Sequence, residues 1–248
     1  MSKLSRRIRR IRQALREWAG QRYLVEGREL MLPAWADDVK RNILRGTYEA
    51  PELRLLARWI GGDRPVVELG GAFGVISAAT ATRLAPGVAH VVVEANPLLV
   101  DYCRRNATSP RGSGAPTVVV SAAVAYGRDR APFVQSDAFL GSRLALAEEG
   151  GTVDVATITL SQILETNRIE LPYDLVCDIE GAELEVLRHD ADALAGCRIA
   201  LIELHPDVFA ANGSSEAGFL HLLDIAGFEV VDRDEHVVVA RNRQTGRG

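Results

Sequence analysis

Short β-branched runs alternate with helical stretches along most of this sequence, and the last two runs are separated by only three residues. The runs that predict strands cover residues 65–69, 90–94, 117–124, 174–178, 198–203, 228–232 and 236–240. Apolar residues at helical spacing follow four of them, at residues 75–84, 98–106, 182–187 and 219–226. This alternation favours a parallel sheet with helices on both faces. Residues 233–235 are too few for a crossover helix, so the last two strands must form an antiparallel hairpin.

A mostly parallel sheet that ends in an antiparallel hairpin identifies a fold more narrowly than the general Rossmann-like alternation of strands and helices does. It resembles the class I methyltransferase fold. We therefore expect an α/β fold with a doubly wound, seven-stranded sheet and that hairpin at its end. Residues 34–44 and 51–60 predict helices ahead of the first strand. The length of 248 residues suits one such domain with an N-terminal extension.

The charge of the chain is unevenly distributed. Residues 1–22 carry a formal charge of +7, so the other 226 residues carry −11. Apolar residues recur in this segment at helical steps, which predicts a basic amphipathic helix; they are Leu4, Ile8, Ile11, Leu15 and Trp18. We expect a methyltransferase-like domain at residues 23–240 and a disordered tail at residues 241–248. The helix is expected to pack on the domain, to form a homo-oligomer or partner contact, or to bind an anionic membrane surface.

Several classes of protein are excluded by what the sequence lacks. No stretch approaches the roughly 20 apolar residues of a membrane span, and the basic N-terminus has no apolar secretory core. Three cysteines without CxxC spacing argue against a disulfide framework or a zinc site, so we expect a cytoplasmic protein, with membrane association left open. The basic segment lacks interleaved aromatic residues and the body is acidic, so no nucleic-acid partner is expected.

A glycine-rich turn follows the first strand of the alternating region. Its spacing is E-x-G-x-x-x-G, formed by Glu68, Gly70 and Gly74, with Gly71 inside it. Such a turn allows close approach of the backbone to a ligand because no Cβ atom intrudes. An acidic residue ahead of the turn disfavours phosphate and suits a cationic ligand such as S-adenosylmethionine (SAM). The alternative is a tight strand–helix turn without a ligand.

The second strand ends in Glu94, 20 residues after Gly74. A carboxylate at this place accepts hydrogen bonds from both ribose hydroxyls of an adenosine ligand. Together with the glycine turn, it predicts an adenosyl cofactor without choosing between SAM and NAD. An ordinary acidic residue at a strand end is the alternative.

The fourth and fifth strands end in acidic residues and a histidine. Asp178 and Glu180 share one face of a strand end, and Glu203 and His205 share a face of the next. Clustered carboxylates orient a hydroxyl, take its proton or bind a cation, and histidine accepts a proton near neutral pH. Helix capping is the alternative for the carboxylates, and a structural role is the alternative for His205. A metal site from Asp178, Glu203 and His205 is conceivable, but we predict none.

Six ordered segments between residues 45 and 206 resemble motifs of the FkbM family of SAM-dependent methyltransferases. They are RGTYE (45–49), VVELGGAFGVIS (66–77), VEANP (93–97), AVAYG (123–127), DLVCDIEGAELEVL (174–187) and IELHP (202–206). The chain departs from the family at Ala72, where the family has Asn, and at Cys177, where it has Lys. Because side chains alternate along a strand, we expect Cys177 on the opposite face from Asp178 and Glu180. This favours a structural role for that position.

The resemblance implies transfer of a methyl group from SAM, usually to a hydroxyl oxygen of a sugar, glycan or small natural product. It implies that Asp178 and Glu180 face the reacting centre, and we predict that the catalytic residues are Asp178, Glu180 and His205, any one of which is a candidate base. It also implies a set of cofactor-binding residues: Glu49, Glu68, Gly70, Gly71, Gly74, Glu94, Ala95, Ser121, Ala122 and Asp178. Glu68 is expected near the methionine amine, Ser121 and Ala122 near adenine, and Glu49 as a residue that closes over the cofactor.

Two other functions remain open on the sequence alone. One is a non-catalytic SAM-binding or interaction module that docks through residues 1–22. The other is an NAD-linked oxidoreductase, which the spacing of the glycines disfavours. The acceptor is not named by any motif, and we expect its specificity to reside in residues 23–50 and in an insertion at residues 128–151.

Overall fold

The computed structural model describes residues 21–25, 27–108, 117–134, 143–144 and 152–245. These residues fall into two compact units, one up to Ala50 and one from Pro51 onward. In the described part of the chain, no helix combines the length and the apolar character that crossing a membrane requires.

The first unit contains a β-hairpin and a helix. β1 (Gln21–Val25) pairs antiparallel with β2 (Arg28–Leu32), and α2 (Asp37–Arg45) follows. Glycine at position 46 ends α2 in the left-handed conformation, near the predicted end of this helix. The hairpin was not predicted from the sequence. The helix predicted for residues 1–22 lies outside the described residues except for its last two, which belong to β1 and not to a helix.

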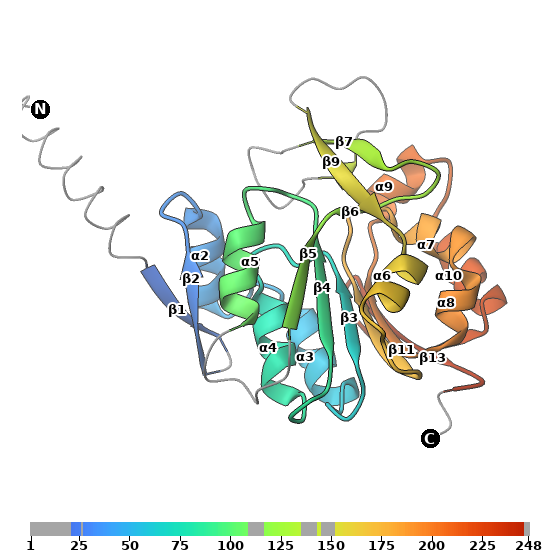
Figure 1. Ribbon diagram of the computed structural model, residues 1–248, viewed down its shortest axis with the longest axis horizontal. Coiled ribbons are helices and arrows are strands. Elements are labelled where there is room, and N and C mark those ends of the chain that lie inside the picture. Colours follow the sequence, from blue (N-terminus) through green and yellow to red (C-terminus); the bar gives the residue numbers. More distant parts are fainter. Residues whose placement is uncertain (1–20, 26, 109–116, 135–142, 145–151, 246–248) are drawn as a thin grey trace, which may run out of the picture. The chain divides into compact units, whose positions relative to one another are not determined.

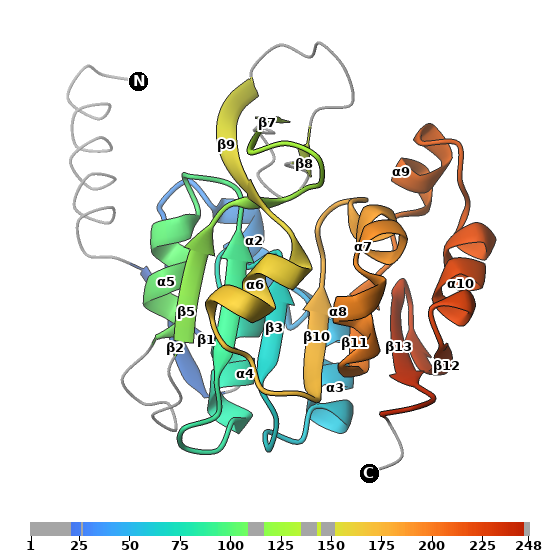
Figure 2. The same cartoon turned by 45° about the vertical axis from the view of Figure 1, so that its right-hand side comes forward.

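The second unit is built on a seven-stranded sheet, with the strand order β12-β13-β11-β10-β3-β4-β5 (Figures 1 and 2). Its strands are β3 (Val66–Leu69), β4 (His90–Glu94), β5 (Thr117–Ser121), β10 (Tyr173–Cys177), β11 (Cys197–Glu203), β12 (Phe228–Asp234) and β13 (Val237–Asn242). The strands β5, β4, β3, β10 and β11 are parallel, and β13 is antiparallel to both β11 and β12. This is the predicted doubly wound sheet with its terminal hairpin, so the class I methyltransferase fold is confirmed.

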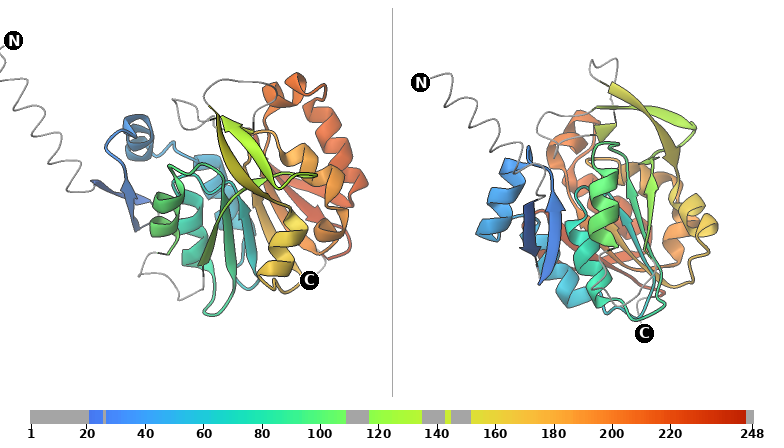
Figure 3. Two further views of the ribbon diagram at one scale, coloured as in Figure 1. Left: turned by 45° about the horizontal axis from the view of Figure 1, so that its top comes forward. Right: turned by 60° about the vertical axis from the view of Figure 1, so that its left-hand side comes forward.

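Helices cover both faces of this sheet (Figure 3). One face carries α3 (Ala50–Trp59) and α4 (Val75–Arg83), whose side chains share a core cluster with Val66, Val176 and Leu201. α5 (Val100–Ala107) packs beside α4. Helices on the opposite face are α6 (Leu160–Thr166), α7 (Glu183–His189), α8 (Ala191–Ala195) and α10 (Glu216–Ile225). Because both faces are covered, β10 is buried along its whole length, and its one charged residue, Asp174, is paired with Arg198.

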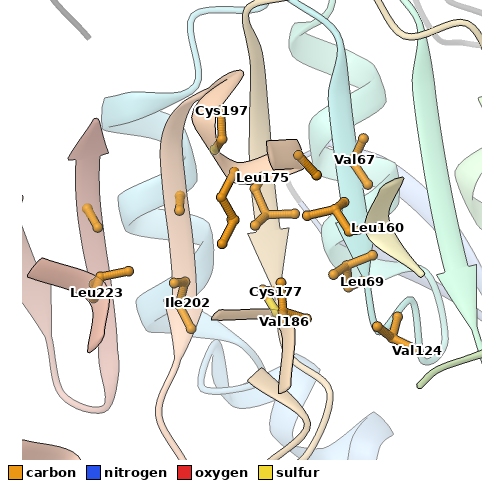
Figure 4. Packing of buried hydrophobic residues seen from close by; sticks show 14 of the residues in the cluster. Val67, Leu69, Val124, Leu160, Leu175, Cys177, Val186, Cys197, Ile202 and Leu223 are labelled. Atoms are coloured by element: carbon orange, nitrogen blue, oxygen red, sulfur yellow. The ribbon is translucent and has the colours of Figure 1, made fainter. Parts of the chain in front are cut away.

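The larger core cluster lies on the face that carries α6, α7 and α10 (Figure 4). Cys177 belongs to it and is 2% exposed. Burial raises the pKa of its thiol well above the usual value, so the thiol stays protonated. Cys177, at the position where the family has a lysine, is therefore part of the apolar core in this chain. This agrees with the structural role predicted from the alternation of side chains along the strand.

The third predicted strand is interrupted. β5 ends at Ser121, and β6 (Ala123–Val124) leaves the main sheet to pair with β9 (Thr152–Ile158). With β7 (Arg130–Val134) and β8 (Arg143–Leu144), these strands form a four-stranded sheet above the carboxyl edge of the main sheet (Figure 2). The insertion therefore contains strands that the sequence did not predict.

The tail predicted from residue 241 is in part ordered. Asn242 ends β13, and the Thr245 hydroxyl donates to the Cys197 carbonyl at 2.8 Å. The prediction of disorder was wrong for residues 241–245, because Arg241 and Asn242 pair with Glu229 and Phe228 of β12 and the next three residues continue in an ordered turn.

Candidate active site

The carboxyl edge of the main sheet brings the predicted segments of the second unit together. The backbone nitrogen of Gly70 donates to the Val93 carbonyl at 2.9 Å, and that of Asp178 donates to the Leu69 carbonyl at 2.9 Å. On the other side, the Ala122 nitrogen donates to the Glu94 carbonyl at 3.1 Å. The ends of β10, β3, β4 and β5 are thus linked in a row, which is where ligands bind in open α/β sheets.

Glycines in the turn after β3 allow the end of β10 and helix α5 to contact this turn. Gly70 has a φ of +90°, and a Cβ atom there would lie 1.6 Å from the Asp178 carbonyl oxygen. At Gly71 a Cβ atom would lie 2.6 Å from Cys103 Sγ. Asn106 Nδ2 donates to the Phe73 carbonyl at 2.7 Å and fixes the turn from α5. The glycines therefore let β10 and α5 approach the turn closely, in addition to any ligand.

Substitution of Gly70 should destabilise the protein strongly. Gly70→Ala places a methyl group on Asp178 and forces a disfavoured φ, so we expect the free energy of unfolding to fall by at least about 2 kcal/mol. Gly127→Ala is the matched control: its φ is +73°, but no atom lies within 4 Å of the added Cβ. It should cost only about 1 kcal/mol. Equal losses for the two variants in denaturant unfolding would contradict this account of the turn.

Glu94 lies at the end of β4 and is 6% exposed. Its carboxylate accepts from the backbone nitrogens of Ala72 and Asn96, each at 2.6 Å. Burial raises its pKa to about 7, although the bonds to those nitrogens oppose the shift. Each carboxylate oxygen has a second lone pair, so both can still accept from ribose hydroxyls. The predicted position of Glu94 beside the glycine turn agrees with the structure.

Glu68 is buried under α4 and has protein partners on both carboxylate oxygens. It accepts from the Ser77 hydroxyl at 2.6 Å, and its other oxygen lies 3.1 Å from His90 Nε2. The Glu68 and His90 side chains are 1% and 0% exposed. Its role in this structure is to join β3, β4 and α4, and a contact with a cofactor amine stays a prediction.

The remaining predicted cofactor residues take different positions. Ser121 is exposed at the end of β5, and Ala122 is buried next to Glu94. Ala95 packs against the core cluster of Ala123, Phe133 and Val155. Glu49 belongs to the first unit, where its φ is +48°, and its predicted role stays a prediction.

Four carboxylates surround the imidazole of His205 at the carboxyl ends of β10 and β11 and the start of α7. We call these five residues the acid–His cluster: Asp178, Glu180, Glu183, Glu203 and His205. The Nε2 atom of His205 lies 3.4 Å from Asp178 Oδ1 and 3.5 Å from Glu180 Oε2. The other ring nitrogen, Nδ1, lies 3.2 Å from Glu183 Oε1. The structure thus brings together all three residues predicted to be catalytic.

Glu183 holds the far side of the His205 ring. Its side chain is 1% exposed, and its Oε1 atom also accepts from the Ile179 nitrogen at 3.0 Å. A buried carboxylate beside Nδ1 favours a proton on that atom and directs the Nε2 lone pair toward Asp178 and Glu180 when the ring is neutral. The sequence placed Glu183 at the helix start but did not assign it this role.

The carboxylates of the cluster control the proton on His205. Burial by itself lowers the pKa of His205, but Glu183, Glu180 and Glu203 outweigh that effect and raise it to about 9. His205 is therefore an imidazolium at neutral pH in the free protein. A cationic ligand beside the same carboxylates would lower this pKa.

Glu180 is held in an unusual backbone conformation. Its φ is +53°, in the left-handed region that residues with a Cβ atom seldom adopt. The next residue, Gly181, also has a positive φ, and a Cβ atom there would lie 2.2 Å from Val208 Cγ1 of α9 (Pro206–Ala211). Strain of this kind is found at functional sites, where the surrounding structure enforces it.

Glu52 is a member of the site region that the sequence did not reveal. It lies in the first turn of α3, is 6% exposed, and shares a hydrogen bond with Glu203. Burial raises its pKa to about 7, and Glu203 adds to the rise. In the sequence it is one acid among several at a helix start, and only the fold shows its neighbour.

Glu52→Gln should make the protein more stable above neutral pH. The folded pKa of about 7 exceeds the ordinary 4.5, so the neutral form is favoured by folding and stability falls as pH rises between these values. The shift corresponds to roughly 3 kcal/mol, which the amide variant should recover in part at alkaline pH. Unfolding by urea at acid and alkaline pH measures this, with the exposed Glu170→Gln as control. A stability difference that does not depend on pH would contradict the assignment.

The donor set of the site fits a cationic adenosyl compound. Glu94 offers carboxylate oxygens for two ribose hydroxyls, and the acid–His cluster offers an excess of carboxylates for positive charge. A divalent cation is a second chemical possibility. Ligand atoms of Asp178, Glu203 and His205 lie within 4.8 Å of one another.

Comparison with known proteins decides the family. A profile described as the Methyltransferase FkbM domain matches residues 68–230, which is more than half of the chain. The chain belongs to the FkbM methyltransferase family. The predicted resemblance is confirmed, and the FkbM protein described here is a SAM-dependent methyltransferase, which decides between the two adenosyl cofactors. No curated protein matches the sequence.

Solved structures similar to this FkbM protein are also methyltransferases. Magnesium protoporphyrin IX methyltransferase from Synechocystis PCC 6803, with bound S-adenosylhomocysteine (SAH), has a TM-score of 0.47 and 12% identity over 83% of this chain and 86% of that one. The O-methyltransferase from Bacillus cereus in complex with SAH has a TM-score of 0.45 and 13% identity, with coverage of 85% and 92%. Aeropyrum pernix fibrillarin, with natively bound SAM, has a TM-score of 0.44 and 14% identity, with coverage of 91% and 84%.

Proposed function

We propose that this FkbM protein transfers the methyl group of SAM to a hydroxyl oxygen of a sugar, glycan or small natural product. The observation that carries the proposal is the acid–His cluster, in which the His205 Nε2 atom lies between two carboxylates and Nδ1 is supported by buried Glu183. A hydroxyl is a weak nucleophile until its proton is removed, and this arrangement is suited to removing it.

The residues of the chain divide the work between holding the cofactor and handling the proton. Glu94 would hold the ribose, and Asp178 would lie beside the reacting centre. When bound, SAM supplies an electrophilic methyl group on a sulfonium. Glu180 and Asp178 orient the acceptor hydroxyl, because both lie within 3.5 Å of His205 Nε2. Positioning of this kind contributes a large part of the rate in methyl transfer.

His205 is the group we assign to take the proton. It must first lose its own, since carboxylates raise its pKa to about 9 in the free protein. A base of this strength is better matched to a hydroxyl than an ordinary carboxylate is. Glu183 then stabilises the imidazolium that forms, as a buried carboxylate does behind a catalytic histidine.

We expect methyl transfer to persist after removal of divalent cations. If Asp178, Glu203 and His205 act on a proton, dialysis against EDTA should change kcat less than about twofold, since no Lewis acid is then needed. Assay of the dialysed protein with and without added Mg²⁺ or Mn²⁺ measures this. Loss of activity that either ion restores would assign these residues to metal binding instead.

A non-catalytic SAM-binding module remains the alternative function. Calorimetry with SAM, followed by a methyl-transfer assay on a panel of hydroxyl compounds, separates the two. Binding together with transfer to a hydroxyl supports the enzyme, whereas SAM binding without transfer to any acceptor in native cell extract supports the module.

The location of the enzyme and its partners are also proposals. We propose a cytoplasmic enzyme with a small-molecule or glycan acceptor and no nucleic-acid partner. Residues 1–22, with their charge of +7, would provide peripheral membrane attachment or a homo-oligomer contact.

A further inference from the structure

A cavity of about 320 Å³ opens beside the acid–His cluster in the second unit. Its walls come from the segment that joins β6 to β7, the loop after β10, and helices α7 and α9. Glu180 is part of its lining and also lies 3.5 Å from His205 Nε2. A ligand in this cavity can therefore present a group to the proposed base.

The walls of the cavity combine apolar surface with polar groups. Val124, Pro132 and Leu184 are among its apolar lining residues, and Arg128, Arg188 and Asn212 are among its polar ones. Asn212 Nδ2 donates to the Val208 carbonyl at 3.0 Å, which leaves the Asn212 side-chain oxygen as an acceptor. Mixed walls of this kind suit a compact ligand with several hydroxyl groups.

Two arginines line the cavity, and they differ in their ion pairs. Arg188 pairs with Glu185 at 2.8 Å, and Glu185 also lies 3.2 Å from His189 Nε2. In the part of the chain that the structure describes, no carboxylate forms an ion pair with Arg128, whose side chain is exposed at the cavity. Glu180 and Glu185 balance the two arginines in formal charge, but Glu185 is engaged by Arg188 and His189, and Glu180 lies 3.5 Å from His205 Nε2. Arg128 is therefore the lining cation that remains for a ligand.

We propose that this cavity is the acceptor site, and that the acceptor is a polyhydroxylated ring bearing an anionic group, a carboxylate or a phosphate. The anion is held by Arg128 with help from Arg188, and a hydroxyl of the same ring faces Glu180 and His205. A guanidinium binds either anion through paired hydrogen bonds, and the binding strengthens in a partly apolar cavity. The inference rests on the proposed function, because it names the acceptor class of the same site.

Binding, measured without turnover, tests the proposal. The full chain is saturated with SAH, whose own Kd is determined first, and then titrated with a hexuronic acid, a hexose phosphate and the neutral hexose. We expect at least one acidic hexose to bind about tenfold or more tighter than the neutral one, since a charge-assisted contact contributes more than 1.4 kcal/mol. The two acidic probes distinguish a carboxylate from a phosphate as the natural group.

Arg128→Gln should abolish this preference and leave the Kd for SAH unchanged. The matched control is Arg130→Gln, two residues away on β7, because Arg130 pairs with Asp154 and does not line the cavity. Both side chains are exposed, so both variants should fold, and thermal melting verifies this. Equal binding of acidic and neutral hexoses, no binding of either acidic probe, or a preference that survives Arg128→Gln would overturn the proposal. Failure to bind SAH would instead count against the proposed function.

Discussion

His205→Gln should lower kcat about 100-fold or more near neutral pH and leave the Kd for SAM within about twofold. The amide keeps the size and polarity of the side chain but accepts no proton. SAM affinity is expected to persist because the ribose and backbone contacts belong to Glu94 and the glycine turn. Steady-state kinetics with the acceptor and calorimetry with SAM measure the two effects separately.

The pH profile gives the same substitution a second readout. Carboxylates raise the pKa of His205 to about 9, so kcat/KM should increase with pH and level off above that value. His205→Gln should remove this rising limb. His221→Gln, an identical change at an exposed histidine on α10, should alter neither the rate nor the profile. A wild-type profile that is flat through about pH 9 would exclude His205 as the base and leave Asp178 or Glu180.

Glu94→Ala should weaken SAM binding about 100-fold or more. The variant removes both acceptors proposed for the ribose and leaves the nitrogens of Ala72 and Asn96 without their 2.6 Å partners. Glu94→Gln retains one side-chain oxygen, so its affinity for SAM should lie between those of Glu94→Ala and the wild type. Calorimetry with SAM measures all three proteins.

SAM binding by the wild type should also respond to pH. The pKa of Glu94 is raised to about 7, so affinity should increase as the carboxylate ionises through that pH. Glu94→Gln should show no such step. Glu170→Ala, an exposed acidic residue, controls for loss of charge alone. If Glu94→Ala folds and binds SAM with wild-type affinity, Glu94 has no role in the cofactor site.

The main sheet could be predicted because its evidence is local. The run at residues 90–94 is buried on both faces, and its three central residues are all valine. The three residues between the last two predicted strands allow only a hairpin, which the structure contains. The hairpin β1–β2 and the sheet of the insertion were missed. Their strands are short or half exposed, as in β9, and they lack the turn sequences that identify hairpins.

The sequence predicted those residues of the candidate site that lie at the ends of strands. Asp178, Glu180 and His205 follow neighbouring parallel strands, so the topology alone brings them together. Glu52 could not be found this way, because its contact with Glu203 depends on how α3 packs against the sheet. Glu68 was assigned to the cofactor from the motif, yet the structure surrounds it with Ser77 and His90.

The most direct test of the account is the chemical position of the transferred methyl group. The wild-type protein is incubated with SAM labelled with ¹³C in its methyl group and an extract of its native cell, and the product is examined by NMR and mass spectrometry. The account predicts an O-methyl signal that is absent when His205→Gln replaces the wild type. A methyl group on nitrogen or carbon, or an O-methyl product formed equally well by His205→Gln, would contradict it.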